Sequence, residues 1–265
     1  MNWDTTGRVS SFSILATATL LTSIAHADVQ TESVKYDHQG VALQGYFAYD
    51  DAISGPRPGV LIVHEWWGLN DYAKQRARQL AKLGYVAFAL DMYGEGKSTK
   101  SRHEAGAWSG QFRSSPLQHQ RASAGLDVLR AHKLVDPKRI TAIGYCFGGT
   151  TVLSLALSGA DVLGVVSFHG NLPLPEPGVD ITAKILVCHG AKDAFVSPER
   201  ISAFQDAMHK TGADWQFIAY SDAVHSFTNP NAARAGIQGV NYNEAADRRS
   251  WQHMRLFFDE LFTAQ

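Results

Sequence analysis

The sequence is poor in cysteine and carries almost no excess of either charge. Of its 265 residues only two are cysteines, and the formal net charge at pH 7 is −1. Lysine and arginine form no cluster or stripe of the kind that binds nucleic acid or an anionic membrane surface. No spacing typical of metal ligands occurs either. We therefore expect no nucleic-acid partner, no metal and no cofactor.

Long apolar runs are also missing after residue 27, so the sequence predicts no membrane-spanning segment there. The first 27 residues differ, because Arg8 precedes the apolar run ILATATLLTSIA and a small-x-small site occupies residues 25–27. This pattern is typical of a secretory signal peptide cleaved after Ala27, with an internal helix as the alternative. We expect an exported protein, periplasmic in a bacterium, with one domain over residues 28–265.

Export bears on the two cysteines, because oxidising compartments favour disulfides. A bridge between Cys146 and Cys188 is one possibility. However, Cys146 lies in a glycine-rich turn, and Cys188 lies in the strand-like segment KILVCHG, where small apolar residues are expected. We therefore expect no disulfide, and we expect Cys188 to be a buried small side chain.

Short apolar segments alternate with helical patterns along most of the chain. The continuous apolar runs, typical of strands buried on both faces, are GVLIVHEWWG, YVAFALDMYG, RITAIGYC, VLGVVSFHG and AKILVCHG. Helical patterns separate several of them, and the amphipathic stretch EAADRRSWQHMRLFFDELF closes the chain. This alternation predicts an α/β fold with a mostly parallel sheet and helices on both faces.

Residues capable of chemistry follow the carboxyl ends of these apolar strands. In chain order, the five strands lead into His64-Glu65, Asp91, Cys146, His169-Gly170 and His189-Gly190. Asp193 lies a little beyond the fifth, and His225 follows the last strand. Functional residues of open parallel sheets gather beyond the carboxyl ends of the strands, so we expect these side chains at one edge of the sheet.

The segment GYCFGG, residues 144–149, has the Gly-x-Cys-x-Gly pattern of a nucleophile elbow. Glycines at 144 and 148 allow a tight turn that places the Cys146 thiol at a helix N-terminus, where thiolate is favoured. The backbone N–H of Phe147 would face the same point and stabilise an oxyanion. The alternative is a glycine-rich turn with a buried, inert cysteine.

Two further residues follow in the order nucleophile, acid, histidine that α/β-hydrolases use. Asp193 lies in the loop HGAKDAFVSP, and His225 lies in the loop DAVHSFTNP. The carboxylate would orient His225, which would act as general base towards the thiol. A solvated loop histidine and a loop acid near a helix start are the alternatives.

The segments GYCFGG, HGAKD and HSF in this order, with VHEWWGLND after an early strand, resemble the dienelactone hydrolase family. These are cysteine α/β-hydrolases that act on lactones and esters, and the resemblance covers nearly all of the chain after the leader. It implies the α/β-hydrolase fold and a Cys146–His225–Asp193 triad. It also implies that Glu65 meets the resting thiol and helps to generate thiolate, and that Trp66 supplies a second oxyanion N–H.

Glu65 has a chemical reason to lie there as well. A carboxylate beside a thiol accepts its proton but repels the free thiolate, so the thiol stays neutral until the carboxylate moves. Protection of this kind would suit an oxidising compartment, because oxidation follows thiolate character. An ion pair with Arg76 or Arg78 is the alternative for Glu65.

Ring side chains would surround the mouth of the cleft. We expect Trp67, Tyr93 and His169 to line a substrate pocket, with core packing as the alternative. The family holds a substrate carboxylate with arginines, one of them shortly after the triad histidine. Here Thr228 and Asn229 occupy that stretch, so recognition of a carboxylate is not predicted.

These observations predict a monomeric hydrolase of a small ester or lactone that works through a thioester on Cys146. An idle hydrolase fold that binds a small ligand is the alternative. Glutamine amidotransferase chemistry is disfavoured, because Phe227 stands where that class needs a glutamate. A peptidase is disfavoured because the chain lacks the additional domain that filters peptides.

Overall fold

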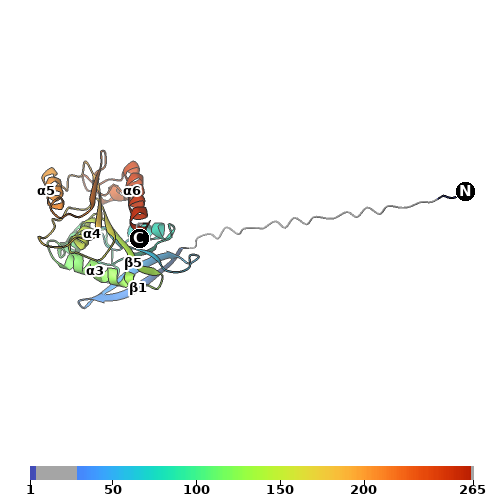
Figure 1. Ribbon diagram of the computed structural model, residues 1–265. Helices are drawn as coiled ribbons and strands as arrows, with labels where there is room; N and C mark the ends of the chain where they lie inside the picture. The colour runs from blue at the N-terminus through green and yellow to red at the C-terminus, as the bar shows by residue number, and fades with distance from the viewer. Residues whose placement is uncertain (4–28, 264–265) are drawn as a thin grey trace.

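A computed structural model describes residues 1–3 and 29–263 of the chain (Figure 1). The expected cleavage site after Ala27 lies outside these residues, so the leader and export stay predictions. Within the described part of the chain, no helix combines the length and apolar character that a membrane crossing requires.

The fold is organised around one eight-stranded sheet in the order β1-β2-β4-β3-β5-β6-β7-β8. The strands are β1 (Val29–His38), β2 (Val41–Asp50), β3 (Arg57–Val63), β4 (Val86–Ala89), β5 (Val135–Tyr145), β6 (Gly164–Phe168), β7 (Lys184–Gly190) and β8 (Trp215–Tyr220). The first two form an antiparallel hairpin, and β2 pairs antiparallel with β4. All pairs from β4 to β8 are parallel, so the predicted mostly parallel sheet is confirmed.

Helices cover both faces of this sheet. They are α1 (Asp71–Ala81), α2 (Arg102–Gly110), α3 (Leu117–Arg130), α4 (Phe147–Leu157), α5 (Pro198–Met208) and α6 (Glu244–Thr263), with a short 3₁₀ helix η1 (Ala232–Ala235). One core layer joins the sheet to α3, α4 and α5 through residues such as Leu126, Val152 and Phe204. The other joins it to α1 and α6 through Leu80 and Phe258. Figure 1 shows α5 and α6 on opposite sides of the molecule.

Local sequence explains where the helices begin. The side chain of Asn70 accepts the N–H of Ala73 and so caps α1, as the sequence predicts. Ser197 caps α5 in the same way, and Pro198 occupies its first turn. Helix α2 was not predicted, because RHEAGAWSG has little apolar periodicity and only Ala105 and Ser109 of this helix are buried.

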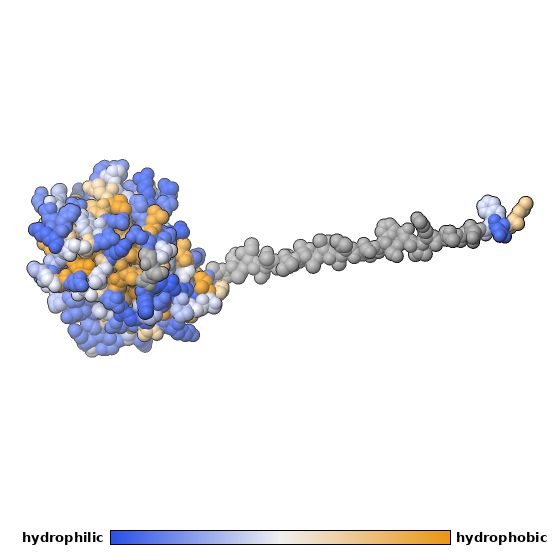
Figure 2. Space-filling model, viewed as in Figure 1, coloured by the Kyte–Doolittle hydropathy of each residue, from blue (hydrophilic) through white to orange (hydrophobic). Residues whose placement is uncertain are grey.

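The central strands are buried on both faces, which is why their sequences do not alternate. In β3, the residues from Val60 to Val63 are fully buried, and every residue of β4 is buried. On the face seen in Figure 2, hydrophilic residues predominate around the rim and hydrophobic ones gather nearer the centre. The predicted α/β-hydrolase fold is confirmed, and the carboxyl ends of β3 to β7 meet at one edge of the sheet.

Candidate active site

The turn between β5 and α4 places Cys146 in a strained backbone conformation. Its φ and ψ are 55° and −115°, values that a residue with a side chain rarely adopts. Neighbouring glycines make the turn possible: a Cβ at position 144 would lie 2.0 Å from the Gly148 carbonyl oxygen, and one at 148 would lie 2.1 Å from that of Val63. Only glycine fits at positions 144 and 148, and the tight turn that these two residues allow places the thiol of Cys146 at the start of α4.

His225 and Asp193 lie in line with this thiol. The Nε2 atom of His225 lies 3.0 Å from Cys146 Sγ, and its Nδ1 lies 2.8 Å from Asp193 Oδ2. The other carboxylate oxygen of Asp193 accepts the backbone N–H of Phe195 at 2.9 Å, which fixes the carboxylate. Loops after β5, β7 and β8 thus bring together three residues that are up to 79 positions apart.

The charge state of His225 is set by these two neighbours. Burial opposes a charged imidazole, but the Cys146 sulfur and the Asp193 carboxylate outweigh it and hold the pKa of His225 well above its usual value. The Asp193 side chain is fully buried, so its attraction for the imidazolium is little screened by solvent. This arrangement favours the charged imidazolium form of His225 beside the sulfur of Cys146.

Glu65 lies beside this group, but its hydrogen bonds go to the histidine loop rather than to the thiol. Its Oε1 accepts the hydroxyl of Ser226 at 3.1 Å, and its Oε2 accepts the amide of Asn229 at 2.7 Å. Burial raises the pKa of Glu65, although both hydrogen bonds act in the opposite direction. The expected contact with Cys146 is absent from this structure, because the thiol pairs with His225 and two better donors face the carboxylate.

Neither of the arginines considered for Glu65 pairs with it. Arg76 forms an ion pair with Asp247 at 2.5 Å. Arg78 instead donates to the hydroxyl of Tyr46 at 3.0 Å. Glu65 is therefore a buried carboxylate held by neutral donors alone, in contact with the segment that carries His225.

The loop after β3 carries the two tryptophans, and Tyr93 supports it. Trp66 and Trp67 are half-buried, with ring centroids 4.7 Å apart. The hydroxyl of Tyr93 donates to the Trp66 carbonyl at 3.1 Å, and its ring lies 5.7 Å from that of Phe147. Tyr93 is only 4% exposed, so it packs beneath the site, while the tryptophans stand at its edge.

Phe147 is the first residue of α4, and its N–H lies at the helix start. The first N–H groups of a helix have no carbonyl partner within the helix. The first intrahelical bond at this end runs from the Thr150 N–H to the Cys146 carbonyl. The N–H of Phe147 is thus free of helical bonding and adjacent to the thiol.

His169 was expected in a substrate pocket, and this expectation is wrong. The residue is fully buried, so it cannot line an open pocket. Its Nδ1 accepts the backbone N–H of Cys146 at 3.0 Å, and its Nε2 lies 2.7 Å from the hydroxyl of Thr228. The carboxyl end of β6 places the ring below the nucleophile, where it contacts the main chain of the elbow.

Several of the remaining polar residues have structural partners. Asp91 accepts backbone N–H groups from Gln44, Tyr93, Gly94 and Gly96 and so holds the loop after β4. His64 bonds the backbone on both sides of its ring. Among residues 29–263, no group of three His, Cys, Asp or Glu side chains has the arrangement of a metal site.

Sequence reasoning missed the polar residues that surround the histidine loop. Thr228 and Asn229 turn into the protein and bond His169 and Glu65 respectively. Both residues directly follow the HSF motif in the chain, and this is the only sequence signal that pointed to them. Arg234, the first arginine after the HSF motif, is exposed, and so are Arg102 and Arg113.

Known proteins of one family are similar to this chain over most of its length. The model of the dienelactone hydrolase family matches residues 43–262. The chain belongs to the dienelactone hydrolase family. It is 41% identical to a solved structure, a dienelactone hydrolase-like promiscuous phosphotriesterase from metagenomic libraries, with a TM-score of 0.84 over 88% of this chain and 98% of the other.

Two other proteins are similar to this chain over most of its length. A solved structure titled m3DLH is 39% identical, with a TM-score of 0.85 over 88% of this chain and 98% of the other. A Yersinia pestis protein named "Putative carboxymethylenebutenolidase" is 26% identical, with 84% of this chain and 85% of that protein covered. The similarity therefore extends over nearly the whole hydrolase domain.

Proposed function

We propose that this member of the dienelactone hydrolase family hydrolyses a small carboxylic ester or lactone through a thioester on Cys146. The observation that carries the proposal is the unbroken line of contacts from Cys146 Sγ through His225 to Asp193, at 3.0 and 2.8 Å. A nucleophile beside a base that a third group orients is the arrangement that acyl transfer needs.

In the first half of the reaction, the Cys146 thiolate attacks the carbonyl carbon and forms a C–S bond. The negative charge then resides on the carbonyl oxygen, which the N–H groups of Phe147 and Trp66 would hold. When the tetrahedral intermediate collapses, the C–O bond breaks and the leaving alkoxide takes the proton of the His225 imidazolium. The acyl group remains on sulfur, and an alcohol leaves, or stays tethered if the substrate is a lactone.

In the second half, neutral His225 removes a proton from water. The resulting hydroxide attacks the thioester, the oxyanion forms again at the same two N–H groups, and Cys146 leaves as thiolate. The carboxylic acid product is released and the imidazolium is restored. Asp193 keeps the Nδ1 proton of His225 in place throughout, so that Nε2 always faces the reacting atoms.

The role that the family implies for Glu65 stays a prediction. Generating thiolate on arrival of substrate would require Glu65 to leave Ser226 and Asn229, since both of its oxygens are bonded there. The connection between β6 and β7 is short and contains no helix, which leaves no room for a large lid and supports a small or exposed substrate.

A second candidate reaction is phosphotriester hydrolysis. The observation that favours it is the 41% identity to a dienelactone hydrolase-like promiscuous phosphotriesterase. The same thiolate would attack phosphorus in place of carbon, and the leaving aryloxide would again take its proton from His225. An aryl phosphotriester therefore belongs in the substrate panel beside esters and lactones.

The test is hydrolysis of a short activated aryl ester by the wild-type protein and by Cys146→Ala. We expect wild-type turnover and a loss of about 10⁴-fold or more in the variant, because no other group can form the acyl intermediate. If the wild type hydrolyses no ester, lactone or phosphotriester while Cys146 still reacts with a thiol reagent, the proposal is wrong and a ligand-binding role takes its place.

A further inference from the structure

The ring of His169 joins two segments that carry the reacting groups. On one side its Nδ1 accepts the N–H of Cys146 at 3.0 Å, a donor shared with the Phe168 carbonyl at 3.0 Å. On the other side its Nε2 lies 2.7 Å from the hydroxyl of Thr228, three residues after His225. One imidazole thus spans the nucleophile's main chain and the loop of the base.

The direction of these hydrogen bonds is determined by the backbone. An N–H group can only donate, so Nδ1 of His169 carries no proton, and Nε2 must be the protonated nitrogen that donates to Thr228. Burial, with the nearby charges of His225 and Arg76, keeps the pKa of His169 well below its usual value, so the ring stays neutral. Only the neutral ring fills both roles, because a second proton on Nδ1 would break the bond to Cys146.

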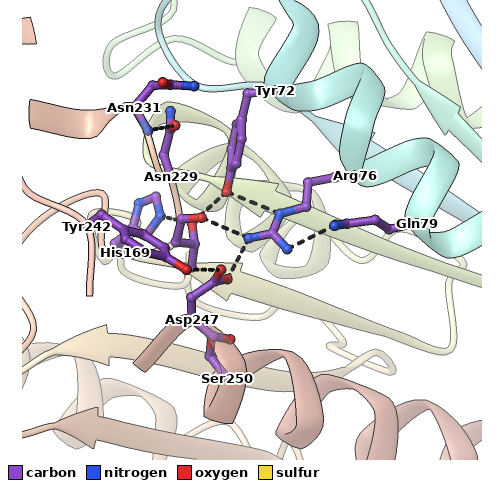
Figure 3. Close-up of polar contacts among 10 residues, drawn as sticks. Tyr72, Arg76, Gln79, His169, Asn229, Asn231, Tyr242, Asp247 and Ser250 are labelled. Carbon is purple, nitrogen blue, oxygen red and sulfur yellow. Dashed lines mark hydrogen bonds and ion pairs between the residues drawn. The ribbon is translucent and has the colours of Figure 1, made fainter. Parts of the chain in front are cut away.

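Thr228 is itself held from the opposite side. Its hydroxyl lies 2.7 Å from that of Tyr72, and its carbonyl accepts a guanidinium N–H of Arg76 at 2.8 Å. Arg76 is in turn anchored to Asp247 of α6, and Figure 3 shows this chain of polar contacts between α1 and the site. The loop that carries His225 is therefore attached to α1 and, through Arg76 and Asp247, to α6.

The backbone at these positions needs such support. Three of the six described non-glycine residues with positive φ are Cys146, His169 and Ser226, at 55°, 42° and 57°. Strained conformations of this kind persist only where surrounding contacts determine them. The hydrogen bonds of His169 connect the strained turn of the nucleophile to the strained segment that follows the base.

We propose that His169 is a positioning residue, which sets the spacing between the Cys146 thiol and the His225 imidazole by bonding the main chain of one and, through Thr228, the loop of the other. The inference rests on the proposed hydrolase function. It assigns to His169, Thr228 and Tyr72 a part in rate rather than in substrate binding. A residue that only packs in the core would not affect the spacing of the reacting groups. Conservative variants therefore distinguish a positioning role from a packing role.

Two variants break the bond between His169 and Thr228, one from each side, and leave an acceptor for the N–H of Cys146 in place. His169→Asn retains an acceptor close to the place of Nδ1 and tolerates a positive φ, but it cannot reach Thr228. Thr228→Val preserves the shape of the side chain and removes the hydroxyl. The matched control is His189→Asn, since His189 is another buried histidine near the carboxyl end of a parallel strand and its Nδ1 has no hydrogen-bond partner in the described part of the chain.

The measurements are kcat and KM for an aryl ester, the pH profile of Cys146 alkylation by iodoacetamide, and the melting temperature. We expect kcat to fall about 10- to 100-fold in His169→Asn and Thr228→Val with KM changed less than about 3-fold, because small misplacements of reacting groups slow the chemical step. The double variant should lose no more than the poorer single one, because both changes break one connection. In the two single variants, the pH at which alkylation of Cys146 is half-maximal should differ from that of wild type. His189→Asn should keep the wild-type profile.

Wild-type kcat and an unchanged alkylation profile in both folded variants would overturn the inference. Additive losses of kcat that track melting temperature, with the alkylation profile unchanged, would overturn it too and leave His169 as a core residue. If the wild type hydrolyses no ester, the proposed function fails, but the alkylation profiles still decide whether His169 positions the thiol against His225.

Discussion

The two cysteines lie near the same edge of one sheet and have opposite surroundings. Cys188 lies inside β7, is fully buried, and has the Tyr220 hydroxyl 3.5 Å from its sulfur. Burial raises the pKa of its thiol to about 12. Cys146 is half-buried at the start of α4, with the His225 imidazole 3.0 Å away. Both residues are cysteines towards the carboxyl ends of parallel strands. The difference between them therefore shows that reactivity depends on the turn that holds Cys146 and on the side chains around it.

Alkylation of the native protein should separate the two thiols most widely. We expect iodoacetamide to modify Cys146 at least about 10³-fold faster than Cys188 at neutral pH, because Cys188 becomes accessible only when the sheet opens. Mass spectrometry of peptides after timed labelling measures both rates. Similar rates in the folded protein would show that burial does not distinguish the cysteines.

Removing the orienting carboxylate should make Cys146 resemble an ordinary thiol. In Asp193→Asn we expect ester hydrolysis to fall about 10³-fold, because the amide stabilises the wrong tautomer of His225 and no longer supports its charge. Loss of that support lowers the pKa of His225, so alkylation of Cys146 at neutral pH should slow as well. Rapid-mixing kinetics and labelling check both effects, and the labelling of Cys188 under denaturant is the internal control.

A polar atom at position 188 should affect stability and leave activity unchanged. We expect Cys188→Ser to lower the free energy of unfolding by about 1–3 kcal/mol, because a hydroxyl replaces sulfur in an apolar layer. Cys188→Ala is the control for lost volume alone, and urea unfolding measures both. A loss of ester hydrolysis in the folded Ser variant would mean that Cys188 takes part in the site after all.

Glu65 is buried as Cys188 is, but it lies near Cys146 and His225. It therefore tests whether burial or the neighbouring site determines what a polar side chain contributes. Its folded pKa is raised above the ordinary 4.5, so the ionised carboxylate costs stability above the folded pKa, and this cost disappears as pH falls towards 4.5. We expect Glu65→Gln to be more stable than wild type by about 1 kcal/mol or more at neutral pH, because Gln can bond Ser226 and Asn229 without a buried charge.

The pH dependence provides the check on this prediction. Unfolding curves of wild type and Glu65→Gln should converge as the pH falls below 4.5, where Glu65 is protonated in both the folded and the unfolded state. A difference that is constant with pH would mean that packing, and not charge, explains the gain. Lost ester hydrolysis in the more stable variant would indicate that the charge is retained for function.

Much of the fold and of the triad was predictable because each rests on local patterns. The apolar runs identified five strands of the parallel sheet, and chain order with the glycines around Cys146 pointed to Asp193 and His225. Such signals survive in the sequence, since buried strands and tight turns restrict residue type position by position.

The partners of buried polar side chains were not predictable in the same way. Glu65 and His169 were each placed near the thiol, but Glu65 bonds Asn229, 164 residues away. His169 bonds Thr228, 59 residues away, as well as the main chain of Cys146. Helix α2 was missed because its sequence shows little apolar periodicity. Each of these features depends on which distant segment packs against it, and no local pattern records that.

By itself, the sequence determined the order of the elements, the family, and the residue types available at one edge of the sheet. The tertiary structure alone decided that Glu65 holds the histidine loop and that His169 bonds the main chain of Cys146. The physical reason is that hydrogen-bond direction and burial belong to groups in contact. Residues separated by as many as 164 positions meet only in the folded protein.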